Sequence, residues 1–123
     1  MRTVASVVDA RLTIQFLVPV RDRAGKPYPR GVKKEVERNL EDRFGGWTRA
    51  DLPLHGAWRN PETQEIERDL SWRYEVWIAP ERVGEIEIYL AELAHRLGQK
   101  AIGVVYGTST AKVIPARAPG SET

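Results

Sequence analysis

Between residues 48 and 59 the chain gathers side chains that could perform acid–base chemistry. His55 lies four residues after Asp51 and four before Arg59, and Thr48 is the only hydroxyl in the segment. A histidine beside a carboxylate can act as a general base near neutral pH, because its ordinary pKa is close to that pH. The segment is therefore a candidate catalytic group, although a loop histidine without a chemical role is the simpler interpretation.

Carboxylates follow at Glu65, Glu67 and Asp69. Glu67 or Asp69 could supply the acid of the same site, and the three together could hold magnesium, which prefers oxygen ligands. Zinc is not expected, because the chain has no cysteine and its two histidines, His55 and His95, share no ligand spacing. We expect no resident metal and no cofactor, and no recognisable motif identifies a reaction.

Two tryptophans, Trp47 and Trp58, and Arg59 are the candidate ligand-binding side chains, because aromatic rings stack on flat ligands. A pocket between the 46–58 segment and a sheet would bring them together. The preceding Gly45-Gly46 pair follows a helical pattern and lacks the ending of a phosphate loop. It therefore predicts a helix end with a positive φ, after which Phe44 packs near Trp58.

The elements that must position these residues are clear from hydrophobic periodicity. Residues 11–20 alternate with a period of two and predict a strand that ends at Pro19. Residues 32–44 carry an apolar residue every four positions and predict a helix. Residues 47–54 predict a strand interrupted at Pro53, and 56–70 predict a hairpin that turns near 60–63.

The second half repeats the alternation of strand and helix. A strand is predicted over 71–78, a helix over 80–97 that stops at Gly98, and a strand over 101–106 that continues raggedly to 114. The order predicts an α+β, ferredoxin-like β-α-β-β-α-β fold, with two helices on one face of a four-stranded antiparallel sheet. A single domain should span 11–114, between an arm or extra strand at 1–10 and a flexible tail at 115–123.

The phases of these elements predict a core between helices and sheet. Its expected members are Leu12, Ile14, Phe16, Val18, Val36, Leu40, Tyr74, Val76, Ile78, Ile86, Leu90, Leu93, Ile102 and Val104. The opposite face of the sheet carries apolar Leu17, Trp77 and Val105, a patch of the kind that partners cover. The polar side chains on the same face are Thr13, Gln15, Arg73 and Glu75. We therefore expect a ligand-binding or self-associating module, a homodimer or higher oligomer, whose open sheet face is the interface.

Charge is unevenly placed, although the net charge is only +2. Residues 21–34 hold six basic residues against one acid, and residues 61–92 hold nine acids against three bases. The basic segment makes nucleic-acid binding an alternative that the acidic half disfavours, because a polyanion would be repelled there. Its basic residues are Arg21, Arg23, Lys26, Arg30, Lys33 and Lys34. The sequence lacks a membrane-spanning segment and a signal-peptide pattern, so we expect a cytoplasmic protein without membrane contact.

Several short motifs resemble a small bacterial family of uncharacterised proteins. They read Arg43-Phe44, Gly46-Trp47-Thr48, Gly56-Ala57-Trp58, Arg68-Asp69-Leu70-Ser71 and Gly98-Gln99. The family has glutamate where this chain has Asp69, and many relatives look exported or lipid-anchored, whereas this chain has no cysteine to lipidate. The resemblance implies a ferredoxin-like fold over roughly residues 11–106, with no assigned activity.

Overall fold

A computed structural model of the protein describes residues 10–112. Within that range five strands form one sheet: β1 (Ala10–Pro19), β2 (Thr48–Arg49), β3 (Leu54–Arg59), β4 (Ile66–Ile78) and β5 (Val104–Lys112). The helices are α1 (Arg30–Phe44) and α2 (Val83–Arg96), and a short 3-10 turn, η1 (Pro80–Arg82), precedes α2. The expected N-terminal arm, up to residue 9, and the tail at 115–123 lie outside the described residues.

The sheet is antiparallel, and β4 is its longest strand. The strand order is β2-β4-β1-β5, and β3 pairs with the first half of β4 beyond β2. The sheet therefore has five strands instead of the predicted four, because one edge strand is broken into β2 and β3. Pro53 lies in the break, where a residue without a backbone N–H cannot continue the ladder.

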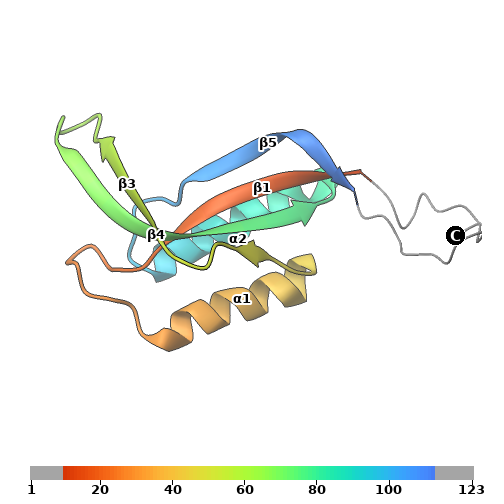
Figure 1. Ribbon diagram of the computed structural model, residues 1–123, viewed down its shortest axis with the longest axis horizontal. Coiled ribbons are helices and arrows are strands. Elements are labelled where there is room, and N and C mark those ends of the chain that lie inside the picture. The colour runs from red at the N-terminus through yellow and green to blue at the C-terminus, as the bar shows by residue number, and fades with distance from the viewer. Residues whose placement is uncertain (1–9, 113–123) are drawn as a thin grey trace, which may run out of the picture.

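The two helices lie on one side of the sheet, as Figure 1 shows. α1 ends at Phe44, where Gly45 adopts φ 87° and its N–H donates to the Glu41 carbonyl. Gly46 follows at φ 152°, so both glycines occupy backbone conformations that side chains disfavour. The predicted sharp reversal after α1 is thus confirmed, and it delivers the chain directly into β2.

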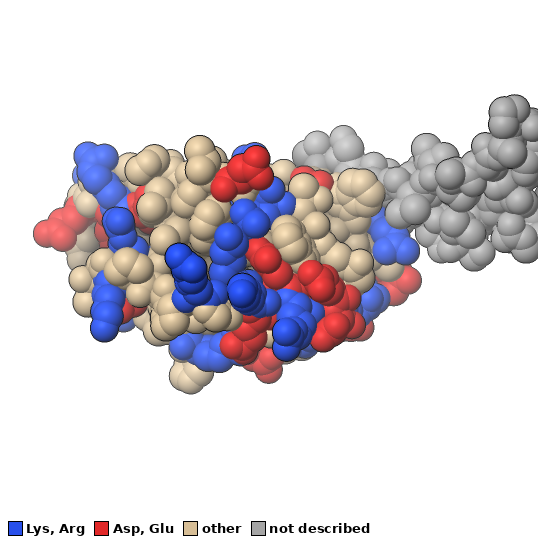
Figure 2. All heavy atoms as spheres, turned by 60° about the horizontal axis from the view of Figure 1, so that its bottom comes forward, with Lys and Arg blue, Asp and Glu red and all other residues tan. Residues whose placement is uncertain are grey.

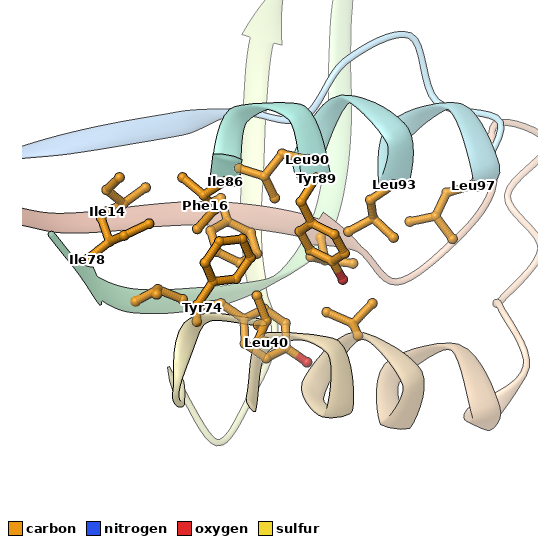
Figure 3. Close-up of a cluster of buried hydrophobic side chains, with 14 residues drawn as sticks. Ile14, Phe16, Leu40, Tyr74, Ile78, Ile86, Tyr89, Leu90, Leu93 and Leu97 are labelled. Atoms are coloured by element: carbon orange, nitrogen blue, oxygen red, sulfur yellow. The ribbon is translucent and has the colours of Figure 1, made fainter. Parts of the chain in front are cut away.

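A continuous core fills the space between the helices and the sheet (Figure 3). Most of its predicted members are buried, while Leu12, Ile102 and Val104 are half-buried at its margin. Phe44, Tyr89 and Leu97 join it, and Phe16 stacks on Tyr74 with their ring centroids 5.7 Å apart. The core buries the helix-facing phase of β1 and β4, so the alternate phase forms the open face.

β3 and the first half of β4 form an arm that projects beyond the helices (Figure 1). Every residue of β3 is exposed. The predicted turn is present, and the Asn60 side-chain oxygen accepts the backbone N–H groups of Glu62 and Thr63. The hairpin prediction is therefore confirmed, with β4 continuing from the arm into the sheet without a break.

None of the helices in residues 10–112 is long and apolar enough to cross a membrane.

Candidate ligand-binding recess

The structure separates the residues that the sequence predicted to share one pocket. Trp58 pairs with Glu67 at one end of β4, whereas Thr48 pairs with Glu75 toward the other. The eight residue steps along the strand from Glu67 to Glu75 span roughly 26 Å. The expected pocket between the 46–58 segment and the sheet therefore does not form as one site.

His55 lies on the exposed arm, opposite Leu70. Asp51 is exposed in the loop before β3, and no hydrogen bond joins it to His55 among the described residues. The Arg59 guanidinium donates to the Gln64 carbonyl at 2.6 Å, within the turn of the arm. The geometry provides no base–carboxylate pair at His55.

Asp69 occupies a different position from the one expected for a catalytic acid. It pairs with Gly56, and its carboxylate lies where a side chain on residue 56 would have to be. A side chain at residue 56 would require the exposed Asp69 carboxylate to move aside. Within residues 10–112 no three histidine, aspartate or glutamate side chains gather to hold a metal ion.

The predicted contact between Phe44 and Trp58 is wrong. Phe44 packs edge-on against Tyr89, with ring centroids 6.0 Å apart. Trp58 remains 49% exposed on the arm. The chain reversal at Gly45 leads into the short strand β2. The edge strand then breaks, and Trp58 lies on β3, away from Phe44.

A recess of about 270 Å³ lies where the reversal after α1 meets the open face of the sheet. Arg11 of β1 and Trp77 of β4 border one side of it, and the 44–48 segment borders the other. The complete lining is Arg11, Phe44, Gly45, Gly46, Trp47, Thr48, Glu75 and Trp77. Side-chain-free glycines leave this space open beside the sheet.

Glu75 is the polar centre of the recess. One carboxylate oxygen accepts the Gln15 amide N–H at 3.0 Å, and the other accepts the Trp77 indole N–H at 2.8 Å. These hydrogen bonds, first from Gln15 and then from Trp77, hold the pKa of Glu75 below its ordinary value of 4.5. Glu75 is thus a positioned anion at neutral pH, suited to bind a cation more than to accept a proton.

The rim of the recess is tied to α1. The Trp47 indole N–H donates to Glu41 at 2.8 Å, and Arg49 donates to Glu37 at 2.9 Å. Tyr74 also donates to Glu37, at 2.8 Å, so one carboxylate joins the helix to both β2 and β4. Burial, together with the hydrogen bond to Glu37, raises the pKa of Tyr74.

A larger cleft, of about 440 Å³, lies between α2 and the segment that enters β5. Its walls include Leu90, Ala94 and Ile102, and exposed His95 and Lys100 lie at its border. Two of its side chains are hydrogen-bonded, since Gln99 donates to the Tyr28 hydroxyl and Glu87 accepts the Tyr106 hydroxyl. Its carboxylate Glu87 has that one partner among the described residues, whereas both carboxylate oxygens of Glu75 accept hydrogen bonds. We therefore place the candidate site in the smaller recess.

The three predicted interface residues do share the open face. Gln15 pairs with Val105 on one side and Glu75 on the other, and Leu17 and Trp77 lie two residues away along their strands. Trp77 is 42% exposed and Val105 is 61% exposed, while Leu17 is half-buried. The apolar patch therefore surrounds the Gln15–Glu75 pair.

Sequence reasoning placed Glu75 on the outward phase but did not identify it as a site residue. The available signal was a carboxylate two residues before an outward-facing tryptophan, on a strand paired with an outward-facing amide at Gln15. The strand register, which aligns Gln15 with Glu75, could not be obtained from periodicity alone.

No family model matches the sequence, and a search of curated proteins finds no match. Two solved structures are similar in fold. A phage SAM lyase in complex with S-methyl-5'-thioadenosine aligns with a TM-score of 0.62 at 8% identity, over 85% of this chain and 90% of that one. A phage SAM lyase in the apo state aligns with a TM-score of 0.59 at 11% identity, over 96% and 98%.

Proposed function

We propose that the protein is a small enzyme-like domain whose recess binds a cationic adenosyl compound of the S-adenosylmethionine (SAM) class. Its fold is ferredoxin-like, with β2 and β3 as two halves of one broken edge strand. The observation that carries the proposal is Glu75, held as an anion by Gln15 and Trp77 at an open recess. The fold likeness to a phage SAM lyase supports the choice of ligand class.

The composition of the recess suits such a ligand. A sulfonium or ammonium group is attracted both to a carboxylate and to an aromatic ring, which Glu75 and Trp77 supply side by side. Arg11 offers the complementary charge for a ligand carboxylate. The glycine pair leaves room for a flat ring beside Trp47.

Titration calorimetry with SAM and with S-methyl-5'-thioadenosine tests the proposal, because only the first carries the cationic sulfonium. We expect SAM to bind more tightly. Glu75→Gln should weaken SAM binding at least about tenfold, since one charge pair near a protein surface contributes roughly 1–4 kcal/mol. The same change should affect the neutral compound much less.

Glu92→Gln is the matched control, because Glu92 is an exposed acid of α2 outside the recess. It should leave both affinities unchanged. Equal binding of the two compounds by the wild-type protein, or no loss on Glu75→Gln, would contradict the role of the anion. Incubation with SAM followed by chromatography for S-methyl-5'-thioadenosine then separates an enzyme from a binding module.

A second candidate function is self-association through Leu17, Trp77 and Val105. The exposed fractions of Trp77 and Val105 favour it, since covering large apolar side chains contributes roughly 1.5–3 kcal/mol each before association costs. Sedimentation equilibrium at micromolar concentration tests it. A single monomeric species, with Val105→Glu showing the same mass, would exclude this role.

We also propose that the protein is cytoplasmic and that it belongs to the bacterial family suggested by the short motifs. Cell fractionation with an antibody to the native protein would test the location.

A further inference from the structure

A cluster of exposed basic side chains lies on α1 and on the loop before it. We propose that this basic surface binds the phosphate backbone of nucleic acid. It comprises Arg21, Arg23, Lys26, Arg30, Lys34 and Arg38. The proposal is independent of the recess, which is bordered by the other end of α1.

The basic surface faces away from the core. Arg30, Lys34 and Arg38 recur every four residues along α1, so they form one stripe with neighbours about 5–6 Å apart. Val36 and Leu40 are buried on the other side of the helix. Figure 2 turns α1 toward the viewer and shows Lys and Arg side chains across the middle of this face, with Asp and Glu among them and most densely toward its right side.

The cations of the basic surface lack acidic partners among residues 10–112. No member has a carboxylate within salt-bridge distance in the described part of the chain. The nearby acids are already engaged. Asp22 accepts the backbone N–H groups of Ala24 and Lys26 and so closes the loop.

The acids of α1 are also occupied elsewhere. Their partners are Arg96 for Glu35, Arg49 and Tyr74 for Glu37, and the Trp47 indole for Glu41. Only Asp42, near the far end of the helix, makes no such bond within residues 10–112. Glu35 and Glu37 are therefore paired with arginines outside the basic surface, whereas Asp22, Glu41 and Asp42 keep their charge. The six cations still outnumber these acids, so the surface is positive on balance.

The start of α1 carries charge of the sign that opposes helix formation. Its first turn has no acidic residue, it begins with Arg30, and Pro29 provides no capping side chain. Cations near a helix N-terminus each cost about 0.3–1 kcal/mol, because they face the positive end of the helix dipole. Such a local conflict is expected where an anionic partner compensates it.

Nucleic acid fits this surface better than a membrane does. Membrane-surface helices place large apolar side chains beside their basic residues. Among the described residues, no large hydrophobic side chain between residues 21 and 38 is exposed. Four of the six cations are arginines, whose planar guanidinium matches phosphate in a bidentate manner. The stripe and loop thus offer several charges without an apolar anchor.

Fluorescence anisotropy with a labelled mixed-sequence DNA duplex of 20 base pairs tests the proposal. If the surface neutralises about four phosphates, the affinity of the wild-type protein should fall about a hundredfold between 50 and 200 mM NaCl. Arg30→Glu with Lys34→Glu should weaken binding at least about tenfold and reduce the salt slope by about two. Arg21→Glu with Arg23→Glu provides the same test without touching a helix.

Arg59→Glu with Arg68→Glu is the matched control, because both residues are exposed on the arm formed by β3 and β4 and the change in net charge is identical. The control should cost less than about threefold, because neither residue belongs to the basic surface and salt screens exposed charges from distant sites. No duplex binding by the wild-type protein at 50 mM NaCl would overturn the proposal. So would an equal loss in the control, or equally tight binding to phosphatidylglycerol vesicles.

Discussion

Replacing Glu37 removes the carboxylate that joins α1 to the sheet beside the recess. One oxygen of Glu37 accepts both the Arg49 guanidinium at 2.9 Å and the Tyr74 hydroxyl at 2.8 Å. The Glu37 and Arg49 side chains are only 16% and 18% exposed, so solvent weakly screens the pair. Glu37→Ala leaves a guanidinium and a hydroxyl without their acceptor.

The size of the effect follows from these contacts. A hydrogen bond to a charged group contributes about 1.5–3 kcal/mol, and an orphaned buried partner adds to the loss. Partial exposure reduces this sum, so we expect Glu37→Ala to lower the free energy of unfolding by about 3 kcal/mol. Glu37→Gln keeps an acceptor oxygen and should cost about half as much.

Urea unfolding followed by tryptophan fluorescence measures both changes. Glu35→Ala is the control, because its pair with Arg96 is about half exposed and should contribute less than about 1 kcal/mol. The loss on Glu37→Ala should persist at 1 M NaCl, where an exposed pair would be screened. A loss of unfolding free energy below about 0.5 kcal/mol on Glu37→Ala, or a loss abolished by salt, would refute the idea that Glu37 joins α1 to the sheet.

Three further predictions concern the core, the reversal and the central anion. Leu90→Ala should lower the free energy of unfolding by about 2–5 kcal/mol in urea melts, whereas Ile88→Ala, on the exposed side of α2, should lower it by less than about 0.5 kcal/mol. Equal losses would mean that the buried side of α2 is assigned wrongly. Gly45→Ala should lower the free energy of unfolding by about 1 kcal/mol through the positive φ alone, since an added Cβ meets no neighbouring atom within 4 Å. Gly84→Ala, inside α2, should instead stabilise the protein. Equal effects of the two changes would contradict the role of the positive φ. The pKa of Glu75 is lowered in the folded state, so ionised Glu75 stabilises the fold above pH 4.5, and this stabilisation is lost as pH falls through the folded pKa. The difference in free energy of unfolding between wild type and Glu75→Gln should therefore narrow below pH 4.5. A difference that does not change with pH would contradict the lowered pKa.

Periodicity was sufficient to predict most of the fold. The alternation in β1 and the four-residue repeat in α1 determined which faces are buried, and Gly45 marked the helix end. Pro53 signalled an interruption, but local sequence cannot say that the chain shifts along β4 after it, because pairing is a long-range property. The fifth strand was missed for that reason.

The candidate site was less predictable than the fold. The segment from Gly45 to Thr48 borders the recess, as a functional segment could, but its proximity in sequence to His55 and Trp58 suggested one shared pocket. The arm instead carries His55 and Trp58 away from that segment. Glu75 belongs to another strand, and only the register of β1 with β4 brings Gln15 to it. Spacing along the chain therefore predicted one wall of the recess and not its polar centre.

The central claim is that the recess around Glu75 binds the ligand, and the four tryptophan indole N–H signals in a ¹H–¹⁵N NMR spectrum test it most directly. Trp→Phe variants assign the signals. On titration with SAM we predict that the signals of Trp77, which donates to Glu75, and Trp47, on the rim, will shift together. The Trp58 signal, on the exposed arm, should remain in place. A shift of Trp58 alone, or no shift at millimolar ligand, would contradict the claim.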